Sequence, residues 1–263
     1  MSALIRAAWR YRGFVASSVA NEFKSRLSRS RFGVAWIVLH PLAQVLIFAT
    51  ILSSVLAARL EGIDNKYAYA AFLMAGIACW SLFAEIVQRC LTVFIDSASL
   101  LKKVQFPRIT LPMVVIGSAT INNLALLAMV LLIFPLLGLM PTLYVLWLPL
   151  LVALTVALAT GVGLLLGTLN VFARDIGQVM AVVIQFWFWV TPIIYPVSIV
   201  PEAFRSTLAL NPMVPLVMGY QNVLVYGKAP PLGLIGVALV ALVALLLAML
   251  VFRRASSEMV DIL

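Results

Sequence analysis

Residues 109–173 read ITLPMVVIGSATINNLALLAMVLLIFPLLGLMPTLYVLWLPLLVALTVALATGVGLLLGTLNVFA and contain no Asp, Glu, Lys or Arg. These 65 residues exceed two crossings of a bilayer, since one helical crossing takes about 20 residues. Gly138, Pro141 and Pro149 interrupt the run, so we expect a turn at Leu137–Thr142 on the outer side of the membrane. The 263-residue chain is 64% hydrophobic and 10% charged, which excludes an ordinary water-soluble domain.

Apolar segments of similar length recur through the rest of the chain. They are continuous runs rather than short alternating ones, which favours helices over a membrane barrel. We therefore predict an all-α integral membrane protein in which residues 32–263 form six transmembrane helices. The expected spans are Phe32–Ala58, Tyr67–Ala84, Ile109–Leu137, Leu143–Phe172, Ile176–Tyr195 and Leu232–Phe252.

The basic residues indicate which segments face the cytoplasm. Seven Lys or Arg residues precede the first expected span, against the single acid Glu22, and such an excess is typical of cytoplasmic segments. Alternation from there places 14 of the 18 basic residues, and both termini, on the cytoplasmic side. The net charge of +9 therefore reports topology, and we expect no nucleic-acid partner.

Residues 1–31 have the pattern of a helix that lies along a membrane surface. Apolar residues recur at helical spacings among Arg and Lys, at Leu4, Ile5, Ala8, Trp9, Val15, Val19, Phe23 and Leu27. We expect a cytoplasmic amphipathic interface helix here. The alternative is a basic tail that fixes the topology and has no partner.

The chain lacks the residue sets of common catalytic and nucleotide sites. The sequence contains no G-x-x-x-x-G-K-[ST] phosphate loop, because the one Gly-Lys pair, Gly227-Lys228, is followed by Ala229. The only cysteines are Cys79 and Cys90, and the only histidine is His40. We therefore expect no disulfide framework, no metal site, no catalytic residue and no cofactor bound by this chain.

Ionisable residues that could couple transport to an ion gradient are expected only at span ends, at Glu85, Arg89, Arg174 and Asp175. A transport subunit powered by a separate protein explains this pattern better than an ion-driven carrier. The alternative from another class is a membrane-integrated transferase that acts on polyprenyl-linked sugars.

Two expected spans each present one polar and aromatic stripe. Trp36, His40 and Gln44 recur every four residues in the first span. Gln178, Gln185 and Trp189 follow at steps of seven and four in the fifth. Aromatic faces and amides suit a sliding sugar polymer, so these six residues are our candidates for a substrate channel. The alternative is hydrogen bonding between helices, with the Trp residues in the interfacial belt.

Residues 196–228 are apolar but broken by prolines, and we predict a re-entrant pair of half-helices between the fifth and sixth spans. Asn211-Pro212 would form the turn, with Asn211 capping the second piece. The alternative is two helices that lie flat on the outer surface.

Three stretches carry motifs in a fixed order. The first is KSR at 24–26, RFGVAW at 31–36 and His40-Pro41. The second runs from Gly76 and Trp80 to LLKKVQFPR at 100–108 and Pro112, and the third is LGTLNVFARDI at 166–176, FWFWVTPIIY at 186–195 and Asn211-Pro212. Together they resemble the transmembrane permease subunit of type-two ABC exporters for polysaccharides, the Wzm-like family of O-antigen, capsule and teichoic acid export. Phe32 stands where that family usually has Leu.

The resemblance implies a homodimer docked on two copies of a cytoplasmic ABC ATPase, which would bind the ATP and Mg, with the polymer passing between the protomers. The interface helix and residues 97–108 would contact the ATPase, with Lys102, Lys103, Phe106, Pro107 and Arg108 in a coupling segment. Arg174 and Asp175 would be a second contact, or an ion pair that caps two helix ends. Asn211 and Pro212 would belong to an outer gate.

The expected function is a multi-pass permease in the bacterial cell inner membrane, surrounded by membrane lipids, that exports a lipid-linked polysaccharide of the O-antigen type. Alternatives within the class are permeases for capsule, teichoic acid or a smaller lipid or drug.

Overall fold

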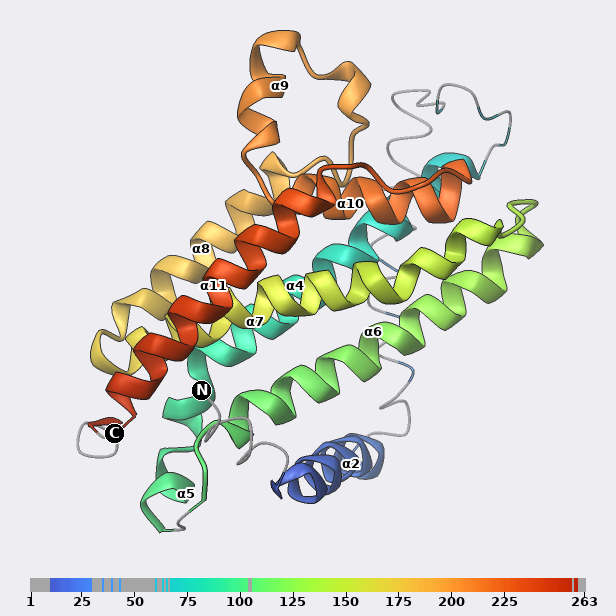
Figure 1. The fold of residues 1–263 in the computed structure, drawn as a ribbon. Helices are drawn as coiled ribbons and strands as arrows, with labels where there is room; N and C mark the ends of the chain where they lie inside the picture. The colour runs from blue at the N-terminus through green and yellow to red at the C-terminus, as the bar shows by residue number, and fades with distance from the viewer. Residues whose placement is uncertain are drawn as a thin grey trace.

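A computed structural model describes residues 10–29, 67–103, 106–256 and 258–259, together with Ala35, Leu39, Ala43, Leu60, Ile63 and Asn65. All regular secondary structure within these residues is helical (Figure 1). The α-helices are α2 (Arg12–Arg29), α4 (Ala68–Asp96), α5 (Ala98–Lys103), α6 (Thr110–Leu136), α7 (Leu148–Phe172), α8 (Asp175–Val190), α9 (Glu202–Ala209), α10 (Met213–Gln221) and α11 (Leu234–Ala255). Short 3₁₀ turns, η1 (Leu143–Trp147) and η2 (Val197–Ile199), and a π-helical turn, η3 (Asn222–Tyr226), complete the set.

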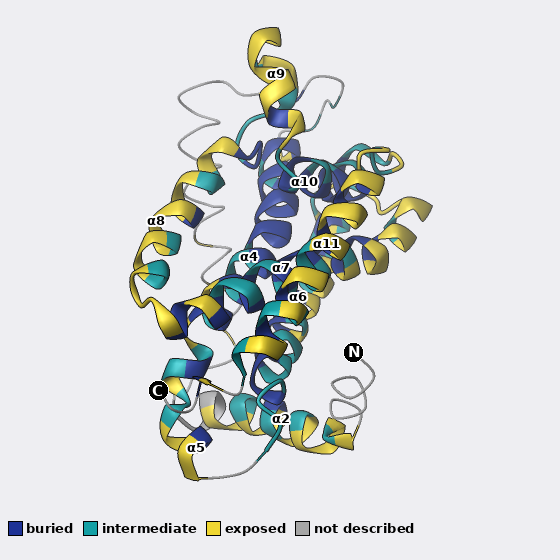
Figure 2. Ribbon diagram, turned by 60° about the vertical axis from the view of Figure 1, so that its left-hand side comes forward, coloured by how far each residue is buried: buried dark blue, intermediate teal, exposed yellow. Residues whose placement is uncertain are grey.

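The long helices α4, α6, α7 and α11 run side by side, α8 runs along the side of this bundle, and α2, α5, α9 and α10 lie at its two ends (Figure 1). One end carries α2, α5 and the last turn of α11 with Arg253 and Arg254, and we call it the basic end. The opposite end carries α9 and α10, and we call it the distal end. Helix α2 lies across the bundle at the basic end (Figure 2).

Helix α4 is the centre of the bundle. Of its 29 residues 19 are buried, and the hydrophobic core gathers around them. Helix α7 approaches α4 closely because Gly163 and Gly167 lack side chains, and a Cβ on Gly167 would overlap the carbonyl oxygen of Cys90. Gly161 allows the same approach to α11, since a Cβ there would lie 2.7 Å from that of Ala244. Small residues of this kind bring helix backbones together where lipid offers no hydrophobic driving force.

The structure contains four of the six predicted spans as long apolar helices: α4, α6, η1 with α7, and α11. The turn predicted at Leu137–Thr142 is confirmed, because α6 ends at Leu136 and η1 begins at Leu143. Gly138 takes a φ of +78° there, and Asn65 Nδ2 donates to the carbonyl oxygen of Leu137 at 2.9 Å.

Two predicted spans are not matched in this way. The expected fifth span corresponds to α8, which has 16 residues and is shorter than the helices of spanning length. The first, Phe32–Ala58, lies almost wholly outside the described residues, as does the N-terminal part of the 1–31 segment. Among the described residues the count is four spans, or five if the bent pair α9 and α10 with η3 crosses as one.

The helix that contains the second predicted span does not end at Ala84, where that span was expected to end. Helix α4 continues for twelve more residues to Asp96, so Glu85 and Arg89 lie inside it rather than at its end. Glu and Arg are good helix formers, and here they pair with each other and with groups on α2 and α6.

The predicted break between two half-helices at Asn211-Pro212 is confirmed. Helix α9 ends at Ala209, α10 begins at Met213, and the chain bends by 104° between them. The two pieces are packed differently, since α10 is mostly buried whereas α9 buries only Leu208. Helix α9 projects from the distal end (Figure 2).

Candidate functional site

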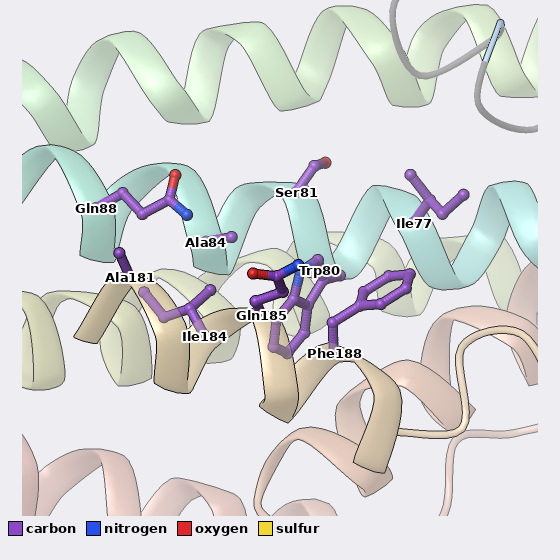
Figure 3. Close-up of a pocket in the computed structure, with 9 residues that line it drawn as sticks. All are labelled: Ile77, Trp80, Ser81, Ala84, Gln88, Ala181, Ile184, Gln185 and Phe188. Atoms are coloured by element: carbon purple, nitrogen blue, oxygen red, sulfur yellow. The ribbon is translucent and has the colours of Figure 1, made fainter. Parts of the chain in front are cut away.

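A groove of about 400 Å³ lies between α4 and α8. Figure 3 shows Gln185 and Phe188 of α8 beside Trp80 of α4. Amide and hydroxyl groups alternate with aromatic and aliphatic side chains along its wall, which consists of Ile77, Trp80, Ser81, Ala84, Gln88, Ala181, Ile184, Gln185 and Phe188. Such a wall can exchange hydrogen bonds with hydroxyl groups and offer ring faces to C–H bonds.

An aromatic cluster holds α8 against α4 beside this groove. The ring of Trp80 lies 5.7 Å from that of Phe188 and 6.3 Å from that of Trp187, both edge-on. Phe83 contacts Trp187 at 5.1 Å, again edge-on. Edge-to-face contacts of this kind each add about 1 kcal/mol beyond the area buried. The cluster therefore fixes the distal half of α8 and leaves the rest of the helix to other contacts.

Asn211 joins the distal end of α8 to α10. Its Oδ1 accepts from the indole Nε1 of Trp187 at 2.8 Å and from the backbone nitrogen of Met213 at 3.0 Å. Its Nδ2 donates to Thr191 Oγ1 at 3.1 Å. The N-cap position of α10 is Pro212 rather than Asn211, so the predicted cap becomes an Asx turn in which Asn211 accepts from the first nitrogen of α10, and the same side chain ties α8 to the bend. Pro212 occupies the position just before α10.

Asn170 has a comparable position at the basic end. Its Nδ2 donates to the carbonyl oxygen of Leu91 at 2.8 Å, and its Oδ1 accepts from the backbone nitrogen of Gly177 at 2.7 Å. One buried amide therefore links the ends of α4 and α7 to the first turn of α8. This geometry gives a structural reason for Asn170 in the LGTLNVFARDI stretch.

The predicted channel residues of α8 separate in the structure. Gln178, Gln185 and Trp189 are all exposed, but only Gln185 of the three lines the groove. Trp189 is 56% exposed and stacks edge-on against Phe188 at 5.6 Å, whereas Gln178 lies near the basic end of α8. The other three predicted channel residues, Trp36, His40 and Gln44, lie outside the described residues.

The α4 wall of the groove was missed by the sequence prediction. Ser81 and Gln88 are seven residues apart and therefore lie on one face of a helix, with Ala84 between them. That spacing was a usable signal for a second polar stripe. It was overlooked because the predicted span ended at Ala84.

Arg89 stands at the centre of a polar network at the basic end. Its Nη2 donates to both carboxylate oxygens of Glu22 on α2, at 2.9 and 3.0 Å. Its Nη1 donates to Glu85 Oε1 at 3.2 Å and to Ser118 Oγ of α6 at 2.8 Å. Asn122 Nδ2 of α6 completes the network by donating to Glu85 Oε1 at 3.0 Å. The network connects three helices, and it was not predicted.

The predicted coupling residues lie together at the basic end. Lys102 and Lys103 are exposed in the last turn of α5. Phe106 packs on the cluster that joins α4, α7 and α11, and its ring lies 5.9 Å from that of Phe14 on α2. Pro107 and Arg108 form the turn before α6, where the Pro107 carbonyl oxygen accepts from Thr110 Oγ1 at 2.7 Å.

Arg174, just before α8, and Asp175, the first residue of α8, are both exposed. Within the described part of the chain, ion pairs join Arg89 to Glu22 and Glu85, and Arg205 to Glu202, and none joins Arg174 to Asp175. Asp175 instead occupies the first turn of α8, where a carboxylate favours the positive end of the helix dipole.

Comparison with known proteins gives consistent results along the chain. A family model described as "ABC-2 type transporter" matches residues 15–225. The O-antigen export system permease protein RfbA of Myxococcus xanthus is 30% identical over 264 residues, which cover 99% of each chain. The protein of the same name from Klebsiella pneumoniae is 27% identical over 207 residues, or 78% of each chain.

Proposed function

The chain belongs to the ABC-2 type transporter family, and we propose that it is the permease subunit of an exporter that moves a lipid-linked polysaccharide of the O-antigen type across the bacterial inner membrane. The observation that carries this proposal is the alignment with an O-antigen export permease along 99% of both chains. The aligned residues include those of the groove, the basic end and the distal bend.

The chemistry of the groove supports a carbohydrate substrate. A sugar ring has C–H faces that stack on aromatic rings such as Trp80, and hydroxyls that exchange hydrogen bonds with amides such as Gln185. None of the described residues that line this groove has an ionised side chain, so these residues would hold each sugar unit weakly and let it slide past. In a dimer, Gln178 and Trp189 on the exposed face of α8, with Trp36, His40 and Gln44, would extend the path.

The energy would come from a cytoplasmic ATPase present in two copies, which would bind the ATP and Mg. The basic end offers a docking surface for it. The exposed side chains of Lys102 and Lys103 supply positive charge, and the contact between Phe14 and Phe106 joins α2 to the 97–108 segment. Arg174 and Asp175, exposed at the same end, would add a second contact. The basic end would therefore be cytoplasmic, with both termini inside.

The distal end would form an outer gate. Asn211 holds α8 and α10 together at the bend, so movement of α8 would be passed to α10. Pro212 would keep the bend rigid, because its ring fixes the backbone φ angle. Two copies of the chain would bring two such bends together above the polymer path.

The test is transport by the chain in vesicles, with and without its ATPase. We expect that polyprenyl-linked polysaccharide enters the vesicles only when chain, ATPase and ATP are all present. A lipid-linked oligosaccharide that is consumed by the chain alone would show a transferase and overturn the proposal. Capsular polymer, teichoic acid and a fluorescent lipid, supplied in parallel, separate O-antigen export from export of the other substrates.

A further inference from the structure

The charges of the Arg89 network are rare in their surroundings. Glu22 is the only acidic residue among the first 60 residues, where it stands among basic ones. Glu85 and Arg89 are the only charged residues between Lys66 and Asp96. The one carboxylate of α2 therefore meets the one basic side chain inside α4. Ionised groups within a spanning helix are costly and usually have a function.

The contact between Glu22 and Arg89 holds α2 at a defined position against α4. Both oxygens of Glu22 accept from a single nitrogen of Arg89, while the other terminal nitrogen is engaged by Glu85 and Ser118. The side chains of Glu22 and Arg89 are only 22% and 29% exposed. The guanidinium of Arg89 is planar, and both of its terminal nitrogens are engaged, so the carboxylate of Glu22 has little freedom to move.

A second contact fixes the other half of α2. Phe14 lies two helical turns before Glu22, about 12 Å along the axis, and its ring meets that of Phe106. Val19, between the two contacts, is buried, and its Cγ2 would lie 3.2 Å from a Cβ on Gly117 of α6. Helix α2 therefore spans the distance from the 97–108 segment to the interior of α4.

Helix α4 carries the contact to the groove. Gln88, the residue before Arg89, lines the groove, and Ser81 and Trp80 follow on the same helix towards the distal end. A displacement of Arg89 along or around the α4 axis therefore displaces the groove wall as well. A displacement at one end of a helix reaches the other end, because the protein interior around the helix is closely packed and hardly compressible.

We propose that the Glu22–Arg89 pair is a positioning contact that makes α2 and α4 move as one body, so that motion of the ATPase at the basic end reaches the groove wall. The inference rests on the proposed function, since it concerns the movement that drives export. Glu22 and Arg89 touch neither the polymer nor ATP. They act through α4, by holding α2 in register with it.

A double-mutant cycle tests the pair in the assembled exporter. The variants are Glu22→Gln, Arg89→Gln and both together, and the readout is ATP hydrolysed per polymer exported in vesicles. We expect each single variant to raise this ratio about fivefold, and the double variant to raise it no further. Glu202→Gln is the matched control, because it removes an exposed pair whose atoms are 4.0 Å apart at the distal end.

A second measurement does not depend on export. Trypsin cleaves after Lys24, which is exposed two residues after Glu22 on α2. We expect cleavage there to become faster in Glu22→Gln and Arg89→Gln, and to remain at the wild-type rate in Glu202→Gln. Equal amounts of copurified ATPase would show that the variants still assemble.

The outcomes separate this proposal from the proposed function. Wild-type coupling and wild-type cleavage in both single variants would overturn it, and so would effects that add in the double variant, since additive effects mean that the two residues act separately. A wild-type complex that exports no polymer would instead contradict the proposed function, and the cleavage experiment would still test the pair.

Discussion

Helices α4 and α8 form the two walls of one groove, yet they are held in opposite ways. Helix α4 buries 19 of its 29 residues, whereas α8 buries only Ile184 of its 16 (Figure 2). The outward face of α8 is apolar, with Val179, Phe186 and Val190 each more than half exposed. The described residues of the chain therefore pack around most of α4, whereas they leave the outward face of α8 exposed. Substitutions around α4 should act on folding, and substitutions on α8 should act on transport.

The largest expected effect is at the contact of α7 with α4. Gly167→Val places a branched side chain where even a Cβ overlaps the backbone of Cys90, so the helices must separate. We expect unfolding to become easier by about 3 kcal/mol, measured as thermal stability and yield of monodisperse protein in detergent. Gly236→Ala on α11 is the control, because a Cβ there meets nothing within 4 Å. Equal stability of the two variants would mean that α4 is not fixed by this packing.

A smaller effect is expected where the two walls meet. Asn170→Ala removes the hydrogen bonds to Leu91 and to Gly177, and so loosens the first turn of α8 from the end of α4. We expect a loss of about 1–2 kcal/mol in the free energy of unfolding, below that of Gly167→Val. Asn170→Asp keeps an acceptor for Gly177 but loses the donor for Leu91. Its free energy of unfolding, compared with that of Asn170→Ala, therefore shows how much each hydrogen bond contributes. Stability unchanged in both variants would show that α8 is held by the aromatic cluster alone.

On the exposed side of α8 we expect almost no effect on folding and a clear effect on transport. Gln185→Ala and Trp189→Ala should change stability by less than about 0.5 kcal/mol. Loss of one amide or aromatic contact should lower export about fivefold, with dimer and ATPase assembly unchanged. Export at the wild-type rate in both variants would show that this face of α8 does not line the path.

The smallest effect on folding is expected beyond the end of α4, in α5. Lys102→Glu combined with Lys103→Glu changes two exposed side chains and should leave thermal stability within about 0.5 kcal/mol of wild type. We expect the ATPase to associate more slowly and more weakly, measured by copurification over a range of salt concentrations. Association and export that are insensitive to both changes would exclude α5 from the docking surface.

The sequence was sufficient to predict what depends on composition and on local spacing. Hydropathy located α6, α7 and α11, and glycine and proline located the turn at Leu137–Thr142. The amide spacing of α8 made Gln185 a candidate channel residue, and in the structure Gln185 lines the groove. Each of these predictions needs only residues within one helix or one turn.

What escaped prediction depends on contacts between distant parts of the chain. The continuation of α4 past Ala84 is stabilised by Glu22, which is 67 residues away from Arg89, and by Ser118 and Asn122 of α6. Without those partners Glu85 and Arg89 have the pattern of a span end. Because the expected span ended at Ala84, Gln88 and its spacing from Ser81 were also overlooked.

The shortness of α8 has a consequence for the membrane itself. At a rise of 1.5 Å per residue its 16 residues are about 24 Å long, whereas the hydrocarbon layer of a bilayer is about 30 Å thick. If α8 crosses the bilayer in the proposed exporter, lipid beside it would thin locally, so that its acyl chains do not lie opposite the polar ends of the helix. A thinner hydrocarbon layer beside the groove shortens the distance over which a hydrated headgroup is deprived of water, and so lowers the barrier to its translocation.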